Sequence, residues 1–108
     1  MDLQNPFSIE TRCIFMYTWE CWLCGENGQR SGGLELHHIF SRISASPLNA
    51  AILCKLCHSH IGHTIEEEQT LLRKTINFLV KEHYKLTEKD EQFLTDLSTN
   101  GRLRGFIL

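Results

Sequence analysis

The sequence predicts a small α+β domain built around a metal-bound hairpin. Two Cys-x-x-Cys pairs indicate the metal, with Cys21 and Cys24 in the first pair and Cys54 and Cys57 in the second. Two short segments between the pairs have the patterns of strands, whereas the flanking segments place apolar side chains at helical spacing. A chain of 108 residues suits one domain, and a metal would supplement the modest core that such a chain can bury.

The first predicted element is a helix over residues 6–19. Asn5 followed by Pro6 is typical of a helix start, with Asn as the N-cap and Pro in the first helical position. The apolar side chains that follow at helical spacing are Ile9, Cys13, Met16 and Tyr17. Cys13 lies outside the two cysteine pairs, and we interpret it as a buried apolar residue.

A β-hairpin is predicted between the cysteine pairs. Turn-forming residues occupy 25–28 and 31–33. Residues 34–40 alternate in part between apolar and polar side chains, as a half-buried strand does. Residues 50–53 form a short apolar run that predicts the return strand, and residues 41–49 form the loop between the two strands.

Two helices are predicted for the rest of the chain. Thr64 and Glu67 have the spacing of a capping box, which opens a helix over residues 65–85. The predicted buried face of this helix consists of Leu71, Leu72, Ile76, Leu79 and Val80. Thr87 with Asp90 begins a second helix. The apolar residues of the second helix are Phe93, Leu94 and Leu97.

The end of the chain completes a single domain, residues 1–108. Gly101 is predicted to stop the last helix. The segment from Gly101 to Leu108 would dock either on the core or on another subunit. Residues 64–108 thus form a helical extension of a metal-bound core, residues 1–63.

The four paired cysteines are predicted to close one structural zinc site. Zinc prefers four thiolate or imidazole ligands in a tetrahedron, and four cysteines leave no open position for a substrate. The 29 residues between Cys24 and Cys54 exceed the roughly 15–20 of a usual zinc ribbon, so a segment is inserted between the pairs. The alternative is that these cysteines are unpaired thiols of the core.

The inserted segment and the residues after it carry most of the histidines. Five of the six are His37, His38, His58, His60 and His63. Adjacent side chains on a strand point to opposite faces, so one of the first two can bind a metal while the other faces a separate point. His58 follows the second cysteine pair directly, where a helix could begin, and can reach back toward the strand.

In motif order and spacing the chain resembles the HNH endonuclease family. The run Leu34–Ile39, then Asn49, then the run Leu53–His58 carry the resemblance, which covers roughly residues 13–63. The similarity is greatest to the cysteine-containing branch of phages and bacteria. It implies a ββα-metal finger, in which a β-hairpin and a helix grip one divalent cation.

The resemblance also implies a role for each motif residue. His37 and His58 would be ligands of the catalytic cation, and His38 would be the general base that activates water. Asn49 would hold the loop and orient His38 through hydrogen bonds. The catalytic cation would be Mg²⁺, Mn²⁺, Ni²⁺ or Zn²⁺, beside the structural Zn²⁺ of the cysteines.

One departure from the family pattern concerns the third ligand. Many members place another metal-binding histidine four residues after the position of His58, where this chain has Gly62. Either the helix is distorted, or His63 substitutes as a third ligand, or the site has two protein ligands. His60 is interpreted as a surface or DNA-facing residue. Arg42 is a candidate phosphate contact, with a solvated loop arginine as the alternative.

The implied activity is metal-dependent hydrolysis of DNA phosphodiester bonds. The alternatives are a non-catalytic zinc-bound module for DNA or protein, and a phage accessory factor in packaging or recombination. A net charge of −2 excludes a global basic field, so DNA contact would depend on local cations. Candidate partners are DNA, a second copy, or a phage packaging or recombination protein. Neither a signal peptide nor a membrane-length apolar run is recognisable, so we expect the cytoplasm of a bacterial host.

Overall fold

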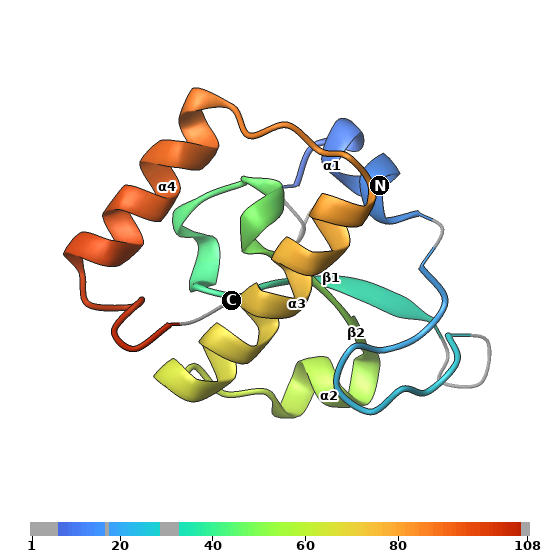
Figure 1. Ribbon diagram of the computed structural model, residues 1–108. Helices are drawn as coiled ribbons and strands as arrows, with labels where there is room; N and C mark the ends of the chain where they lie inside the picture. Colours follow the sequence, from blue (N-terminus) through green and yellow to red (C-terminus); the bar gives the residue numbers. More distant parts are fainter. Residues whose placement is uncertain (1–6, 17, 29–32, 107–108) are drawn as a thin grey trace.

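The computed structural model describes residues 7–16, 18–28 and 33–106, which form a two-stranded sheet surrounded by helices (Figure 1). The elements, with two 3₁₀ turns named η1 and η2, are α1 (Ile9–Phe15), β1 (Leu34–His38), η1 (Ser41–Ile43), η2 (Pro47–Asn49), β2 (Ala50–Cys54), α2 (Lys55–His60), α3 (Ile65–Lys81) and α4 (Glu88–Thr99). The predicted α+β class is confirmed in this form, a small mixed domain with an antiparallel hairpin. No helix in the described ranges is long and apolar enough to cross a membrane.

The hairpin is the frame on which the other elements are placed. β1 pairs antiparallel with β2, from Leu34 opposite Cys54 to His38 opposite Ala50. All five residues of β2 are buried, whereas in β1 only His37 is. α2 begins directly after Cys54 and contacts both strands, and α3 crosses the hairpin against β2 and η2 (Figure 1). The two ends of the hairpin therefore carry the second cysteine pair and the histidine pair, respectively.

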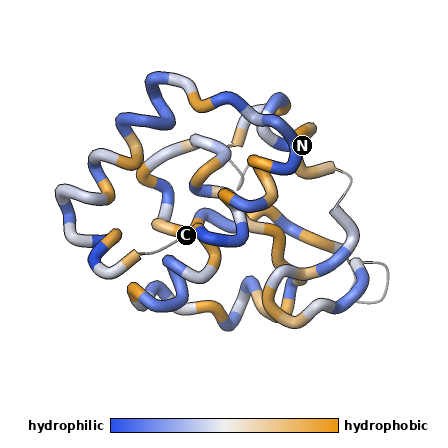
Figure 2. Tube along the Cα trace, viewed as in Figure 1, coloured by the Kyte–Doolittle hydropathy of each residue, from blue (hydrophilic) through white to orange (hydrophobic). Residues whose placement is uncertain are grey.

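α3 buries one face, as the sequence predicted. Its buried side chains are Glu68, Leu71, Leu72, Thr75 and Leu79. Thr75 Oγ1 donates to Ala50 O at 2.7 Å and joins the helix to β2. The prediction for Val80 is wrong, because this side chain follows Leu79 around the helix and is 68% exposed. Figure 2 shows hydrophobic and hydrophilic residues alternating along α3 and α4, as expected of helices with one buried face.

The ends of α3 differ from the prediction in detail. Thr64 Oγ1 accepts from Glu67 N, but the Glu67 carboxylate bonds Gly62 N and the Thr64 hydroxyl, so the capping box is only half formed. The helix stops at Lys81, four residues earlier than predicted. His83 follows with φ 57°, a left-handed conformation that ends a helix.

The first helix is shorter than predicted and presents a different face. Ser8, not Asn5, is the N-cap, and its hydroxyl accepts from Thr11 N. The helix ends at Phe15 rather than at residue 19. Asn5 and Pro6 themselves lie outside the described residues, as does Tyr17.

The core-facing residues around α1 explain the error in its predicted face. Phe7 and Phe15 are buried, and the small, buried Thr11 lies four residues from each of them on the same face. Cys13 is exposed rather than buried, because it points away from this stripe. Ile9 and Met16 are also exposed. Two large aromatic rings thus determine the orientation of α1.

α4 forms as predicted. Thr87 and Asp90 make a complete capping box, and the helix ends before Gly101 with φ +76°. Phe93 and Leu97 are buried, and Leu94 packs against the core. The buried Asp90 carboxylate also accepts from Ser46 Oγ at 2.6 Å and from Tyr84 OH at 2.5 Å, which joins α4 to the loop after β1.

The segment after α4 docks on its own chain, one of the two alternatives left open by the sequence. Leu103 and Phe106 pack against the core. Gln69 Nε2 in α3 donates to Arg102 O at 3.0 Å and to Arg104 O at 2.9 Å. These contacts place the C-terminal segment against the first turns of α3.

Candidate functional site

The two cysteine pairs meet in one cluster. The sulfur atoms of Cys21, Cys24, Cys54 and Cys57 lie within 4.8 Å of one another, with 3.8 Å between the sulfurs of Cys24 and Cys54. A tetrahedral zinc with Zn–S bonds of about 2.3 Å would set its sulfurs about 3.8 Å apart. In the described part of the chain, no other group of three or more His, Cys, Asp or Glu ligand atoms is this close. The cluster could therefore hold a metal such as zinc.

Local turns explain how the first pair is shaped and held. Cys21 N donates to Glu26 O at 3.0 Å, and Gly25 N donates to Cys21 O at 2.9 Å. Gly25 has φ +75°, a conformation that other residues rarely adopt. Trp22 N donates to Ile52 O at 2.9 Å and so ties this turn to β2. The first pair thereby reaches the end of β2 that carries the second pair.

The protonation of the clustered thiols depends on whether a cation is bound. Cys54 is the N-cap of α2, and its sulfur accepts from Cys57 N. Burial and, after it, the neighbouring sulfurs together raise the pKa of the Cys57 thiol to about 12. Burial also raises the pKa of Cys21, but backbone N–H groups outweigh it and lower that pKa to about 6. Four adjacent thiolates repel one another, so a bound dication would be needed to deprotonate all of them.

Three histidines from three elements form a second cluster. The His37 ring on β1 lies 5.0 Å from the His58 ring in the first turns of α2, centroid to centroid. The His63 ring, from the connection between α2 and α3, lies 5.7 Å from the His37 ring. The predicted ligands His37 and His58 are thus neighbours, and the candidate third ligand His63 joins them. The nitrogen atoms of the three rings lie farther apart than the four sulfurs, which are within 4.8 Å of one another.

Two of these rings are oriented through their Nδ1 atoms. His58 Nδ1 lies 3.0 Å from Glu35 Oε1, and His63 Nδ1 lies 3.1 Å from Ile39 O. A carbonyl oxygen only accepts, so Nδ1 of His63 carries the proton. Metal-binding histidines commonly use one ring nitrogen in this way and leave the other for the metal. No described residue bonds Nε2 of either ring, and the buried Nε2 of His37 also has no partner among them.

The unusual spacing after the second cysteine pair has a structural explanation. α2 ends at His60, and Ile61 is already extended with ψ 135°. Gly62 therefore does not lie on the helix face of His58, and its N–H donates to Glu67. The turn that follows brings His63 back toward the strand. His60 is exposed, with Nδ1 2.8 Å from Leu56 O, and takes no part in the cluster, in line with its interpretation as a surface residue.

His38 points to the other face of β1, as expected of adjacent strand residues. Its ring stacks on Phe7 with centroids 4.0 Å apart and planes 7° from parallel. Its Nε2 is buried and has no hydrogen-bond partner in the described segments. Burial and, after it, the positive charge of Arg42 together lower the pKa of His38 to about 4. The imidazole is therefore neutral at neutral pH.

The pKa of His37 is lowered for a similar reason. Burial and, after it, the neighbouring His58 and His63 together lower it to about 4. A neutral imidazole keeps a lone pair on one nitrogen, which is the form that binds metal. His37 is thus in the protonation state that binds metal at neutral pH.

Asn49 holds the loop that follows His38. It is fully buried, its Nδ2 donates to Ser41 O and Ser44 O at 2.9 Å each, and its Oδ1 accepts from Phe40 N at 2.8 Å. Ile39 N donates in turn to Asn49 O. Among the described contacts the Asn49 side chain does not touch the His38 ring, so any effect on that ring passes through the backbone after it.

The histidines line an open cavity of about 1030 Å³. Its wall includes three cationic side chains, which are Arg12, Arg42 and Lys55. Arg42, the candidate phosphate contact, lies here together with His38, and Glu35 is the acidic residue of the wall. The cavity therefore combines clustered imidazole rings with a local excess of positive charge.

Sequence reasoning missed the acidic residues around the histidines. Glu35 precedes His37 by two positions on a strand, so both lie on one face, and this spacing was a usable signal. Glu68 and Arg102 approach His63 from α3 and from the C-terminal segment. Nothing in the local sequence indicates that pairing.

Comparisons with protein-family models, with curated proteins and with solved structures find no match for this chain. The geometry of the two clusters is therefore the basis for inferring a function.

Proposed function

We propose that this protein is a metal-dependent DNA endonuclease of the HNH type, with β1, β2 and α2 as its ββα-metal finger. One observation carries the proposal: the rings of His37, His58 and His63 lie together in a cavity that His38 also lines, and no described residue bonds their Nε2 atoms. The order strand, strand, helix matches the expected finger, with zinc at the four cysteines as its staple.

The three clustered histidines are the residues that would hold the catalytic cation. Glu35 and the Ile39 carbonyl fix two of the rings, so little orientational freedom would be lost on binding. A divalent cation there would supply Lewis-acid stabilisation of the phosphate and of the leaving oxygen. Imidazole ligands suit Zn²⁺ and Ni²⁺ best, and Mg²⁺ or Mn²⁺ less well.

His38 is the proposed general base. It is neutral at neutral pH, so it can accept a proton from water. A pKa of about 4 makes it a weaker base than an ordinary histidine. A phosphate bound beside Arg42 would offset the positive charge of that side chain and raise the His38 pKa toward the working range. The base would then be strengthened by substrate.

Arg12, Arg42 and Lys55 are the proposed contacts for DNA phosphates. They surround one cavity, so the chain needs no global positive charge to attract a nucleic acid there. Backbone phosphates are the same in every sequence, so these contacts would favour DNA binding without sequence preference.

A second candidate function is a zinc-bound binding module without catalysis. It is favoured by the looser spacing of the histidine nitrogens, which do not meet the separation found at the four sulfurs. In that reading the cavity binds an anionic partner, and the histidines contribute only hydrogen bonds.

Plasmid nicking separates the two candidates. Wild type should nick supercoiled DNA when Zn²⁺, Ni²⁺, Mn²⁺ or Mg²⁺ is supplied. The His38→Ala variant should be about 10²–10⁴-fold slower, with its zinc content and circular dichroism unchanged. The matched control is His60→Ala, because His60 is exposed and lies outside the cluster. Equal rates for His38→Ala and wild type would disprove the proposed base, and no cleavage by wild type with any of the cations would favour the binding module.

A further inference from the structure

The most unusual charged group outside the two clusters is the carboxylate of Glu68. It lies in the first turns of α3 and is 1% exposed. Burying an ionised carboxylate is expensive unless it is paired and hydrogen-bonded. The groups that pair with the Glu68 carboxylate therefore indicate its role.

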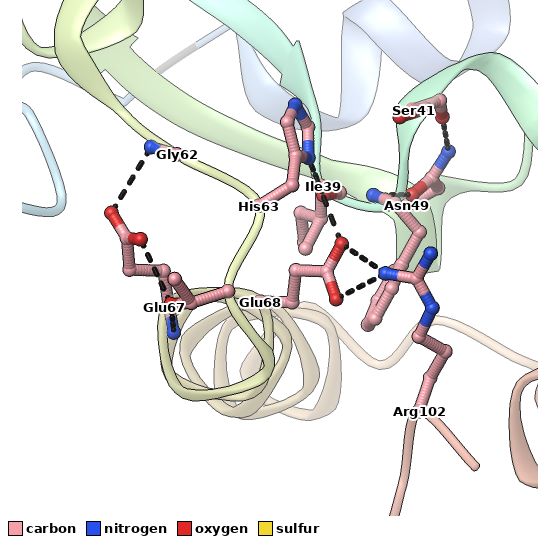
Figure 3. Close-up of polar contacts among 10 residues, drawn as sticks. Ile39, Ser41, Asn49, Gly62, His63, Glu67, Glu68 and Arg102 are labelled. Atoms are coloured by element: carbon pink, nitrogen blue, oxygen red, sulfur yellow. Dashed lines mark hydrogen bonds and ion pairs between the residues drawn. The ribbon is translucent and has the colours of Figure 1, made fainter.

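Arg102 supplies the pairing from the far end of the chain. Its Nη1 donates to Glu68 Oε1 at 2.6 Å and to Oε2 at 2.7 Å. The same Oε2 lies 3.6 Å from Nδ1 of His63. Figure 3 shows the three side chains in a row, with Glu68 between Arg102 and His63. The carboxylate therefore faces the ring nitrogen that also contacts the Ile39 carbonyl.

The segment that carries Arg102 is held independently of this ion pair. Gln69 donates to two of its backbone carbonyls, and the Arg73 guanidinium lies 5.2 Å from the centroid of the Phe106 ring. The Arg102 side chain is thus presented to Glu68 by a docked backbone. An ion pair needed only to attach the segment would be redundant with these contacts.

We propose that Glu68 and Arg102 are positioning residues of the histidine cluster, a role that rests on the proposed cation site. Arg102 fixes the Glu68 carboxylate, and Glu68 with the Ile39 carbonyl holds the Nδ1–H of His63. This arrangement keeps Nε2 of His63 available beside the His37 ring. The C-terminal segment is then part of the site, although it lies 34 residues away from Glu68 in sequence.

The direct readout is the His63 ring itself. In full-length protein with zinc at the cysteines and no added second cation, ¹⁵N NMR should show His63 of wild type as the Nδ1–H tautomer. Glu68→Gln and Arg102→Met would leave the Ile39 carbonyl as the main partner of Nδ1–H, so part of the His63 population should shift to the Nε2–H tautomer. The His58 signals, which depend on Glu35, should stay unchanged. A merely structural ion pair would not act on one ring in this selective way.

The second readout is cation binding. Titration of the same zinc-loaded proteins with Co²⁺, followed by absorbance and calorimetry, should show about 10–100-fold weaker binding at the histidines in both variants. Arg102→Lys, which keeps the charge, should restore part of the affinity. Arg104→Met is the matched control, because it removes an exposed cation of the same segment and should change neither readout.

The outcomes separate this proposal from the proposed function. Unchanged His63 tautomer and Co²⁺ affinity in both variants would overturn the positioning role and leave the nuclease proposal standing. A tautomer change without any Co²⁺ binding by wild type would support the positioning role and count against the cation site. If Arg102→Met does not fold, Glu68→Gln decides the question, since it removes the charge with little change in shape.

Discussion

The four cysteines and the three histidines are built in opposite ways on one hairpin. The cysteines come as two local turns, and all four sulfurs lie within 4.8 Å of one another. The histidines come from a strand, a helix and a loop, and their rings stand 5.0 and 5.7 Å from the central His37 ring. Four cysteines would fill the tetrahedron around a zinc ion, whereas the three histidines lie at a cavity and would leave a position for a further ligand.

The two clusters differ in how much they depend on the rest of the fold. Two short turns suffice to shape the cysteine cluster, and a metal there would mainly stabilise the domain. The histidine cluster requires partners outside it, namely Glu35, the Ile39 carbonyl and Glu68. A metal held by four cysteines would stabilise the fold, whereas a metal held by three histidines would have room for a further ligand.

Substitution of one metal-facing cysteine should have the largest effect. Cys54→Ser would remove one thiolate ligand from a metal at the cluster, whereas the serine hydroxyl could still cap α2. We therefore expect loss of zinc and, with it, loss of cooperative folding. Metal analysis and circular dichroism measure both. Retention of a folded, zinc-free domain would show that the cysteine cluster is not needed for folding, contrary to the stabilising role given to it here.

The loop beside the histidines should be the next most sensitive place. Asn49→Ala leaves Phe40 N without its acceptor and Ser41 O and Ser44 O without their donor, which should reduce the free energy of unfolding by about 3–4 kcal/mol. Urea denaturation measures the loss. Asn77→Ala, at an exposed position of α3, should change it by less than about 0.5 kcal/mol. Equal effects would contradict the role given to Asn49.

The histidine cluster should also make stability depend on pH. In protein with no second cation, burial lowers the pKa of folded His37 to about 4, below the ordinary value of 6.5 expected when unfolded. The unfolded chain therefore takes up the proton first as pH falls. The contribution of His37 is fully present above pH 6.5 and is lost progressively toward pH 4, by about 3 kcal/mol in all.

Comparison with His37→Leu isolates that contribution. A metal bound at the cysteines would be lost from both proteins as acid protonates the thiols, so only the difference between them reports on His37. Denaturation at pH 7.5, 6 and 5 should show a shallower fall for the variant. Parallel curves would mean that His37 is not desolvated in the folded protein.

The smallest effect is expected at the remaining cysteine. Cys13 is exposed and lies outside the cluster, so Cys13→Ser should retain zinc and change the free energy of unfolding by less than about 0.5 kcal/mol. It is the matched control for Cys54→Ser. Loss of zinc in the Cys13 variant would show that the ligand set has been misassigned.

Local patterns predicted the elements whose causes are local. The cysteine turns, the hairpin and the capping box of Thr87 with Asp90 all depend on neighbouring residues. The face of α1 was predicted wrongly, because the burial of Phe7 and Phe15 outweighs the apolar pattern that included Cys13.

The candidate site was predictable only in part. His37 and His58 are neighbours because β1 pairs with β2, and α2, which carries His58, begins at the end of β2. The place of His63 depends on where α2 ends, and Gly62 was the available signal for that end. The row from His63 through Glu68 to Arg102 depends on how the last segment docks, which no local pattern encodes.

The buried Asp90 gives the helical extension a consequence for dynamics. Its carboxylate joins the start of α4 to Ser46 in the loop that Asn49 fastens from within. Detaching α4 would therefore break a bond of that loop and expose a carboxylate-bonded hydroxyl. We therefore expect α4 and this loop to open together as one cooperative unit. Their slowly exchanging amide hydrogens should then have similar exchange rates, whereas a helix that opened on its own would exchange faster than the loop.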